Sequence, residues 1–183
     1  DRAMNESQPK LARRAVLGGL LAAPFVVRPA EAWSDSRFVR FHNIHTGEQL
    51  NATHWKDRQY DRQALQDLNW FLRDWRAHRI HAMDPLTLDI IYWTSHRMGS
   101  SGKAEIISGY RTPKTNAMLR SHSLAVAKDS FHMAGRAIDF RLLDRSIKDT
   151  HKAVLTRQYG GVGLYTKSQF IHVDTGPVRS WGI

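Results

Sequence analysis

The 183-residue chain is long enough for one domain, and its 42% hydrophobic and 10% aromatic residues provide the material for a packed core. These values exclude intrinsic disorder, and the absence of cysteine excludes disulfides, a thiolate nucleophile and Cys-ligated metal centres. The formal net charge of +10 favours polyanionic surroundings, without saying whether the polyanion is nucleic acid, lipid or cell wall.

Residues 1–32 have the pattern of a twin-arginine signal peptide. Arg13-Arg14 precedes an uncharged, largely apolar run over residues 15–27, and residues 30–32 match an A-x-A cleavage site. Because this run is shorter than the roughly 20 residues that span a bilayer as a helix, we expect no stable membrane span after cleavage. The alternative is a retained anchor or a surface helix.

This signal predicts the Tat export machinery as a partner and the periplasm as the location. Met4 is the expected natural start, which leaves residues 1–3 as a remnant and residues 33–183 as the mature domain. That domain stays basic after residues 1–32 are removed. An exported protein rarely meets nucleic acid, so we expect no nucleic-acid partner.

Hydrophobic periodicity predicts both strands and helices in the mature chain. Leu65, Leu68, Leu72 and Trp75 share one helical face, and Asp84-Pro85 has the form of a helix start. In chain order we expect a hairpin over 36–55, helices over 62–78 and 85–98, a strand over 104–108, a short helix from 112, a strand over 136–141, a helix over 146–159, and strands over 162–165 and 170–174. This order predicts an α+β fold with a small, mostly antiparallel sheet flanked by helices.

Three polar side chains have the residue types and positions of a metal site. His132 precedes the strand that carries Asp139, and in the alternating segment 170–174 His172 and Asp174 project from the same face. If the two strands pair, His132, Asp139 and His172 converge. Two imidazoles and a carboxylate suit one Zn²⁺ per chain, and three protein ligands leave a position for a water whose pKa would fall to about 7. Taken alone, this spacing also fits paired surface polar residues.

Four sequence blocks together resemble the M15 zinc peptidases and, within that family, its murein endopeptidase branch. The blocks are S-G-Y-R-T at 108–112, S-x-H-x-x-G-x-A-x-D at 130–139, G-G-V-G-x-Y at 160–165 and F-I-H-V-D-x-G-x-x-R-x-W at 170–181. The resemblance covers nearly all of the mature chain. It implies a fold similar to the D-Ala-D-Ala peptidases and the hedgehog signalling domain.

The same resemblance implies zinc on His132, Asp139 and His172 and cleavage of peptidoglycan peptide stems outside the cytoplasm. The murein endopeptidase branch further implies cleavage of the 3-3 cross-link between two diaminopimelate residues. Gln169 departs from the pattern, because several relatives carry Glu or Asp three residues before the last zinc-binding His as general base, and an amide cannot accept a proton.

The general base is therefore open. Asp174 shares a strand face with His172 and is the first candidate; its alternative role is to orient a ligand imidazole. His122 is the next candidate, and attack by metal-bound hydroxide without a dedicated base is a third route.

Other residues of the motifs have two interpretations each. The Arg111 guanidinium could stabilise an oxyanion or clamp a substrate carboxylate, or it could form an ordinary ion pair. The glycines at 160–163 are not followed by the Lys of a phosphate loop, and they predict instead a sheet edge that a peptide approaches closely. Arg179 and Trp181 either pack the C-terminus or touch substrate.

The leading hypothesis is an exported, zinc-dependent murein endopeptidase that uses metal-activated water. The alternatives are a zinc-containing peptidoglycan-binding module without turnover, a peptidoglycan carboxypeptidase on the same site, and a basic nucleic-acid binder.

Overall fold

The computed structural model describes residues 36–123 and 125–182. The predicted signal peptide over 1–32 and the predicted start at Met4 lie outside the described residues. Within the described part of the chain, no helix combines the length and the apolar character needed to cross a membrane.

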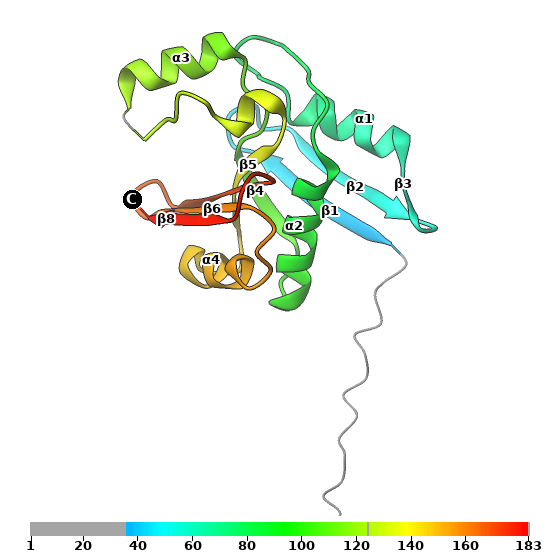
Figure 1. The fold of residues 1–183 in the computed structure, drawn as a ribbon. Coiled ribbons are helices and arrows are strands. Elements are labelled where there is room, and N and C mark those ends of the chain that lie inside the picture. The colour runs from blue at the N-terminus through cyan, green and yellow to red at the C-terminus, as the bar shows by residue number, and fades with distance from the viewer. Residues whose placement is uncertain (1–35, 124, 183) are drawn as a thin grey trace, which may run out of the picture. The chain divides into compact units, whose positions relative to one another are not determined.

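An eight-stranded sheet forms the centre of the described domain, in the order β3-β2-β1-β4-β5-β7-β6-β8 (Figure 1). The strands are β1 (Arg37–Asn43), β2 (Gln49–Lys56), β3 (Gln59–Tyr60), β4 (Lys103–Ser108), β5 (Ala137–Leu142), β6 (Gly161–Tyr165), β7 (Phe170–Asp174) and β8 (Arg179–Gly182). The pairs β1–β4 and β6–β8 are parallel and the remaining pairs are antiparallel. The predicted α+β class and mostly antiparallel sheet are therefore confirmed.

The sheet is larger than the small one that we expected. The β1–β2 hairpin joins it through the parallel β1–β4 pair, and β8 adds an edge strand beside β6. Neither pairing connects segments that are close in sequence, so local periodicity does not reveal them.

Four α-helices accompany the sheet in the described chain: α1 (Arg62–Phe71), α2 (Pro85–Arg97), α3 (Pro113–His122) and α4 (Ile147–Leu155), with a 3₁₀ turn, η1, over Phe131–Ala134. Each α-helix begins after an Asp, Thr or Ser whose side chain accepts a backbone N–H of the first turn. Asp84 and Pro85 act as the sequence predicts, at N-cap and N1 of α2.

The helix predicted over 62–78 ends at Phe71. The reason is Asp74, whose buried carboxylate accepts the backbone N–H groups of Arg76, Ala77 and Thr112. A continued helix would leave this buried charge without those donors, at a cost of several hydrogen bonds. Trp75 consequently lies beyond the helix, where it stacks on His45 with ring centroids 5.1 Å apart.

The helix predicted over 146–159 also ends early, at Leu155. Gln158 has φ of 53°, in the left-handed region, which a right-handed helix cannot include. The chain therefore turns before it enters β6.

One face of the sheet carries the hydrophobic core. Alternate residues of the central strands point to this face, and α1, α2 and α4 contact those strands. The buried hydrophobic strand residues of this core are Val39, Phe41, Ala104, Ile106, Ile138, Phe140, Leu142, Val162, Ile171 and Val173. In Figure 1, α3 lies on the other side of β6 and β8 from α4. The face opposite the core is thus left for polar side chains of β5 and β7.

Phe140 follows Asp139 on β5, and its fully buried side chain lies in the hydrophobic core. We expect Phe140→Ala to lower the free energy of unfolding by about 3–5 kcal/mol, because buried contacts are lost and a cavity remains. Leu143→Ala is the matched control, since that side chain is 55% exposed, and it should change stability by less than about 0.5 kcal/mol. Urea unfolding followed by circular dichroism measures both; equal losses would show that Phe140 is not part of the core.

Candidate metal centre

A row of residues crosses four adjacent strands on the polar face. Asp139 of β5 lies opposite His172 of β7, His172 lies opposite Gly163 of β6, and Gly163 lies opposite Trp181 of β8. Directly opposed residues project from the same face of a sheet. Strand pairing alone therefore brings a carboxylate, an imidazole and an indole side by side.

His132 joins this row from η1, the turn that precedes β5. Ser130 caps the turn, and Gly135 ends it with φ of 66°. Gly135 is also required by space, because a Cβ there would lie 2.3 Å from the Ala82 carbonyl oxygen. The His132 ring is 1% exposed, and its Nδ1 lies 2.7 Å from the Gly109 carbonyl oxygen. The imidazole is thus held with Nε2 facing β5 and β7.

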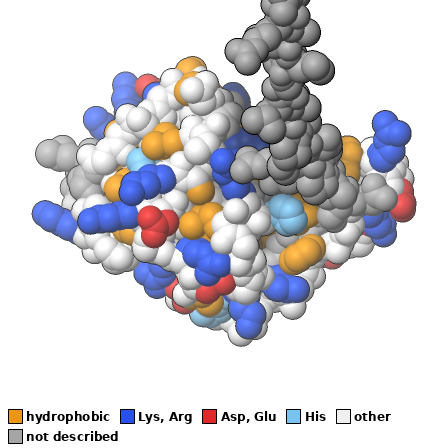
Figure 2. All heavy atoms as spheres, turned by 90° about the horizontal axis from the view of Figure 1, so that it is seen from below, with side chains coloured by type: hydrophobic (Ala, Val, Ile, Leu, Met, Phe, Trp, Pro, Cys, Tyr) orange, Lys and Arg blue, Asp and Glu red, His pale blue; other side chains and the backbone are white. Residues whose placement is uncertain are grey.

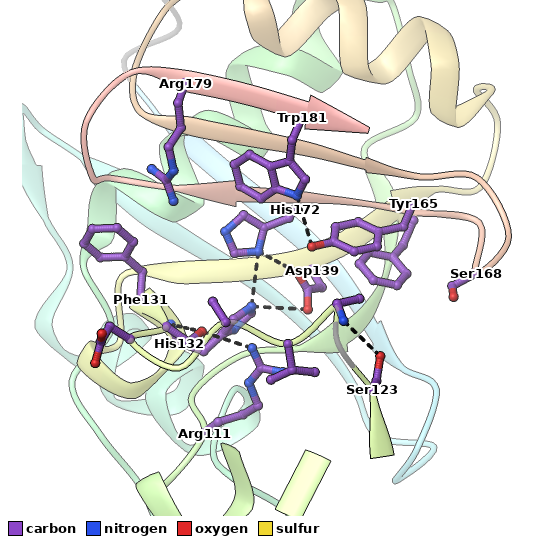
Figure 3. Close-up of a pocket in the computed structure, with 16 residues that line it drawn as sticks. Arg111, Ser123, Phe131, His132, Asp139, Tyr165, Ser168, His172, Arg179 and Trp181 are labelled. Atoms are coloured by element: carbon purple, nitrogen blue, oxygen red, sulfur yellow. Dashed lines mark hydrogen bonds and ion pairs between the residues drawn. The ribbon is translucent and has the colours of Figure 1, made fainter. Parts of the chain in front are cut away.

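The side chains of His132, Asp139 and His172 bring their potential metal-ligand atoms together at this point (Figure 3). His132 Nε2 lies 3.2 Å from His172 Nδ1 and 3.2 Å from Asp139 Oδ2, while His172 Nδ1 lies 2.8 Å from Asp139 Oδ1. Tetrahedral zinc with bonds of about 2.0–2.1 Å places neighbouring ligand atoms about 3.3 Å apart. The distances among the two ring nitrogens and the carboxylate oxygens are close to that edge, so the group can hold a metal ion.

The hydrogen bonds on the outer side of each ring point to the same conclusion. A carbonyl oxygen only accepts, so His132 Nδ1 donates to Gly109, and in the neutral ring Nε2 then carries a lone pair. His172 Nε2 donates to the Asp174 carboxylate at 2.9 Å, which leaves a lone pair on Nδ1. Two lone pairs and a carboxylate oxygen that face each other repel unless a cation or a proton lies between them. These residues therefore fit a divalent metal.

Charge and burial determine how the metal-free cluster holds protons. Burial lowers the pKa of His132, which keeps this ring neutral. Burial also lowers the pKa of His172, but the contacts with Asp139 and Asp174 outweigh it and raise that pKa to about 9. Burial would raise the pKa of Asp139, yet the two imidazoles hold it well below its usual range. A metal would displace the proton that His172 keeps.

A pocket of about 220 Å³ lies over the cluster. His132, Asp139 and His172 form part of its lining, and Arg111 enters it beside them (Figure 3). The Arg111 guanidinium donates to Ser130 Oγ at 3.1 Å, while its buried Nε has no partner among the described residues. Burial lowers the pKa of Arg111 without removing its charge at neutral pH. A guanidinium cation at a pocket wall is suited to bind an anionic oxygen.

Asp174 contacts Nε2 of the His172 ring, whereas Asp139 contacts Nδ1 on the other side of that ring. Its carboxylate accepts His172 Nε2, the Arg179 guanidinium at 2.7 Å, and the backbone N–H groups of Gly161 and Gly176. Burial opposes ionisation, but these donors hold the pKa of Asp174 well below its usual range. Asp174 is fully buried and does not line the pocket. This geometry favours the orienting role over the general-base role.

Two further base candidates lie away from the pocket. Gln169 is exposed in the β6–β7 turn, where its side chain donates to the Thr166 carbonyl oxygen. His122 is exposed at the end of α3, with Nδ1 2.8 Å from the Met118 carbonyl oxygen. Neither residue lines the pocket.

The glycines at 160–163 make room for the chain itself, so the prediction of a sheet edge open to a peptide is wrong. β6 is paired on both sides, with β7 and β8. A Cβ at Gly161 would lie 2.5 Å from the Arg179 guanidinium, and one at Gly163 would lie 2.6 Å from the Trp181 indole. Arg179 and Trp181 consequently pack on β6 and also line the pocket, and their contact with substrate stays a prediction.

Several pocket residues have no role that the sequence motifs predict. Tyr165, Phe131 and Asp129 line the pocket, as does most of the segment between α3 and η1. Strand alternation would have placed Tyr165 on the face of Gly163, but only the pairing of β6 with β7 shows that this is the face of His172. The segment before η1 has no periodicity, so nothing in the sequence places Asp129.

Comparison with known proteins identifies the family of the chain. The peptidase M15 family described as peptidoglycan L,D-endopeptidase MepK matches residues 31–181. Peptidoglycan L,D-endopeptidase MepK of Escherichia coli (strain K12) is 40% identical over 169 residues, which cover 90% of this chain and 93% of that protein. The probable peptidoglycan L,D-endopeptidase MepK of Haemophilus influenzae is 40% identical over 146 residues, covering 79% and 78%. No solved structure matches the chain, so the likeness to the hedgehog and D-Ala-D-Ala peptidase folds stays a prediction.

A buried His-Asp-His cluster at the floor of a pocket, in a chain matched over most of its length by peptidases, defines a metallopeptidase. The chain belongs to the M15 family of hydrolytic metallopeptidases, in the group described as peptidoglycan L,D-endopeptidase MepK.

Proposed function

We propose that this protein is a zinc-dependent peptidoglycan endopeptidase that hydrolyses the 3-3 peptide cross-link between two diaminopimelate residues. The observation that carries the proposal is the convergence of His132 Nε2, His172 Nδ1 and an Asp139 oxygen, each held by a hydrogen bond on its outer side or by strand pairing. Membership of the MepK group supports the substrate.

His132, Asp139 and His172 would hold one zinc ion per chain and leave room for water and substrate, as in other catalytic sites with three protein ligands. Zinc in such a site polarises a carbonyl and makes water nucleophilic at neutral pH. Arg111, which lines the pocket, binds the scissile carbonyl oxygen through its guanidinium as negative charge develops on that oxygen.

Asp174 positions His172 by accepting its Nε2–H. We expect Asp174→Asn to weaken zinc affinity by about 10–100-fold, because an amide holds the ring orientation and basicity less well than a carboxylate does. Competition with a chromogenic zinc chelator measures this affinity. Asp149→Asn, at an exposed carboxylate in the first turn of α4 that accepts a hydrogen bond from the N-cap Ser146, is the control and should leave zinc affinity unchanged. If both variants bind zinc as the wild type does, Asp174 has no part in holding the site.

Export fits this substrate, since peptidoglycan lies outside the cytoplasm. The twin-arginine segment over 1–32 would direct the folded domain through the Tat machinery to the periplasm. On the face seen in Figure 2, Lys and Arg side chains are spread over the surface with fewer Asp and Glu among them. A basic surface of this kind attracts the enzyme to a polymer that carries free carboxylates.

Incubation of the purified protein with defined cross-linked muropeptide dimers, analysed by mass spectrometry, tests the function. We expect monomer products from the 3-3 dimer in the presence of zinc and none after chelation. Binding without products would support the module without turnover, and release of only a terminal residue would support a carboxypeptidase. Oligonucleotide binding that is salt-sensitive and persists in His132→Ala would support the alternative of a basic nucleic-acid binder instead.

A further inference from the structure

Tyr165 is the last residue of β6, on the same face as Gly163 and His172. Its ring stacks on Phe170 of β7, with centroids 4.5 Å apart and an angle of 16° between the planes. Figure 3 shows the hydroxyl end of Tyr165 pointing toward Asp139 and His172, on the side of Asp139 away from Arg111 in that view. The phenol therefore reaches the pocket from a rigid strand pair.

The hydrogen bonding of this hydroxyl is incomplete. Trp181 Nε1 lies 3.1 Å from Tyr165 Oη, and an indole N–H can only donate. The phenol oxygen is thus the acceptor, and its own hydrogen remains to be donated. Among residues 36–123 and 125–182, Trp181 is the only side chain that forms a hydrogen bond with this hydroxyl. Burial raises the pKa of Tyr165, so the hydroxyl keeps its proton at neutral pH.

The contact between Trp181 and Tyr165 is specified by the sheet. Gly163 is paired with Trp181, and a Cβ on Gly163 would lie 2.7 Å from the indole Nε1. Only a glycine lets the indole lie flat across β6 and reach the phenol oxygen. The arrangement fixes the direction of the free O–H, because the other side of Oη is occupied by Trp181.

We propose that Tyr165 donates a hydrogen bond to the scissile carbonyl oxygen as negative charge develops on it, as a second donor beside Arg111. The proton stays on Tyr165 Oη throughout, so the residue stabilises charge and transfers nothing. Two donors aimed at one developing oxyanion from different sides are the usual form of such stabilisation. The inference depends on the proposed function, since it needs a hydrolytic reaction at the cluster.

Tyr165→Phe tests the inference, because it keeps the ring that stacks on Phe170 and removes only the hydroxyl. We expect kcat on the 3-3 muropeptide dimer to fall about 100-fold, the usual effect of losing one oxyanion donor, with KM changed less than about twofold. Zinc stoichiometry should equal that of the wild type. Affinity for a phosphinate analogue of the substrate should fall by the same factor as kcat/KM, because the analogue carries the charge of the transition state.

Two control variants separate catalysis from packing. Tyr159→Phe removes a phenol outside the pocket, one that accepts a hydrogen bond from Arg157, and should leave kcat unchanged. Trp181→Phe removes the indole donor but keeps the Tyr165 hydroxyl, so its loss of kcat should be smaller than that of Tyr165→Phe. Equal losses of kcat in Trp181→Phe and Tyr165→Phe would show that Tyr165 only anchors Trp181, and the inference would be wrong.

The failure of this inference is distinguishable from failure of the proposed function. If the wild type cleaves the dimer in a chelator-sensitive way and Tyr165→Phe retains its kcat and phosphinate affinity, the function stands and the role of Tyr165 is overturned. If the wild type gives no products, the proposed function falls and the role of Tyr165 falls with it.

Discussion

We expect replacement of Asp139 by alanine to remove bound zinc and hydrolysis together. The variant leaves two imidazoles without the carboxylate that lies within 3.2 Å of both, and two neutral ligands hold zinc far less tightly than the complete set. We expect less than about 0.1 zinc per chain after dialysis and turnover reduced by at least about 1,000-fold, because the bound metal would supply both the electrophile and the activated water.

Metal analysis by mass spectrometry and muropeptide turnover, measured on the same preparation, check this result. The fold should persist, since the core lies on the opposite face of the sheet and does not depend on the ion, unlike the core of a zinc finger. Asp67→Ala, at an exposed carboxylate on α1, is the matched control and should keep both zinc and activity. A folded Asp139→Ala variant with one zinc per chain would contradict the ligand assignment.

Arg111→Met is expected to reduce kcat by about 100- to 1,000-fold with little change in KM or in zinc content, as for loss of an oxyanion donor. Methionine fills much of the space of the arginine stem but provides no N–H group. Arg111→Lys restores a positive charge without the planar set of donors, so it should recover only part of the lost rate. A circular dichroism spectrum shows whether the Ser130 contact matters for folding.

Separate measurement of kcat and KM in Arg111→Met shows which role Arg111 has. A rise in KM at constant kcat would show that the guanidinium clamps a substrate carboxylate in the ground state. Unchanged kinetics in Arg111→Met would leave it as a structural residue that joins η1 to the loop before α3, where its backbone N–H also donates to the His132 carbonyl oxygen.

Much of the site follows from alternation along short segments. The pattern of segment 170–174 correctly places His172 and Asp174 on one face of β7, and the block over 130–139 correctly places a turn before β5. The different roles of His172 and Asp174 do not follow from it. They depend on which ring nitrogen faces Asp139, and that is decided by the pairing of β5 with β7 and by donors from Arg179, Gly161 and Gly176.

The larger departures from the predicted fold have tertiary causes. The early end of α1 follows from hydrogen bonds between Asp74 and Thr112, which are 38 residues apart. The contact between Tyr165 and Trp181 needs β8 to pair in parallel with β6, and no local pattern predicts that pairing. Sequence periodicity finds strand faces but not the neighbours that those faces meet.

Anomalous scattering at the zinc absorption edge, recorded from crystals of the zinc-loaded protein, tests the central claim most directly. We expect a single strong peak per chain, about 2.0–2.2 Å from His132 Nε2, His172 Nδ1 and an Asp139 carboxylate oxygen. A peak at any other set of residues, or none at this cluster, would contradict it.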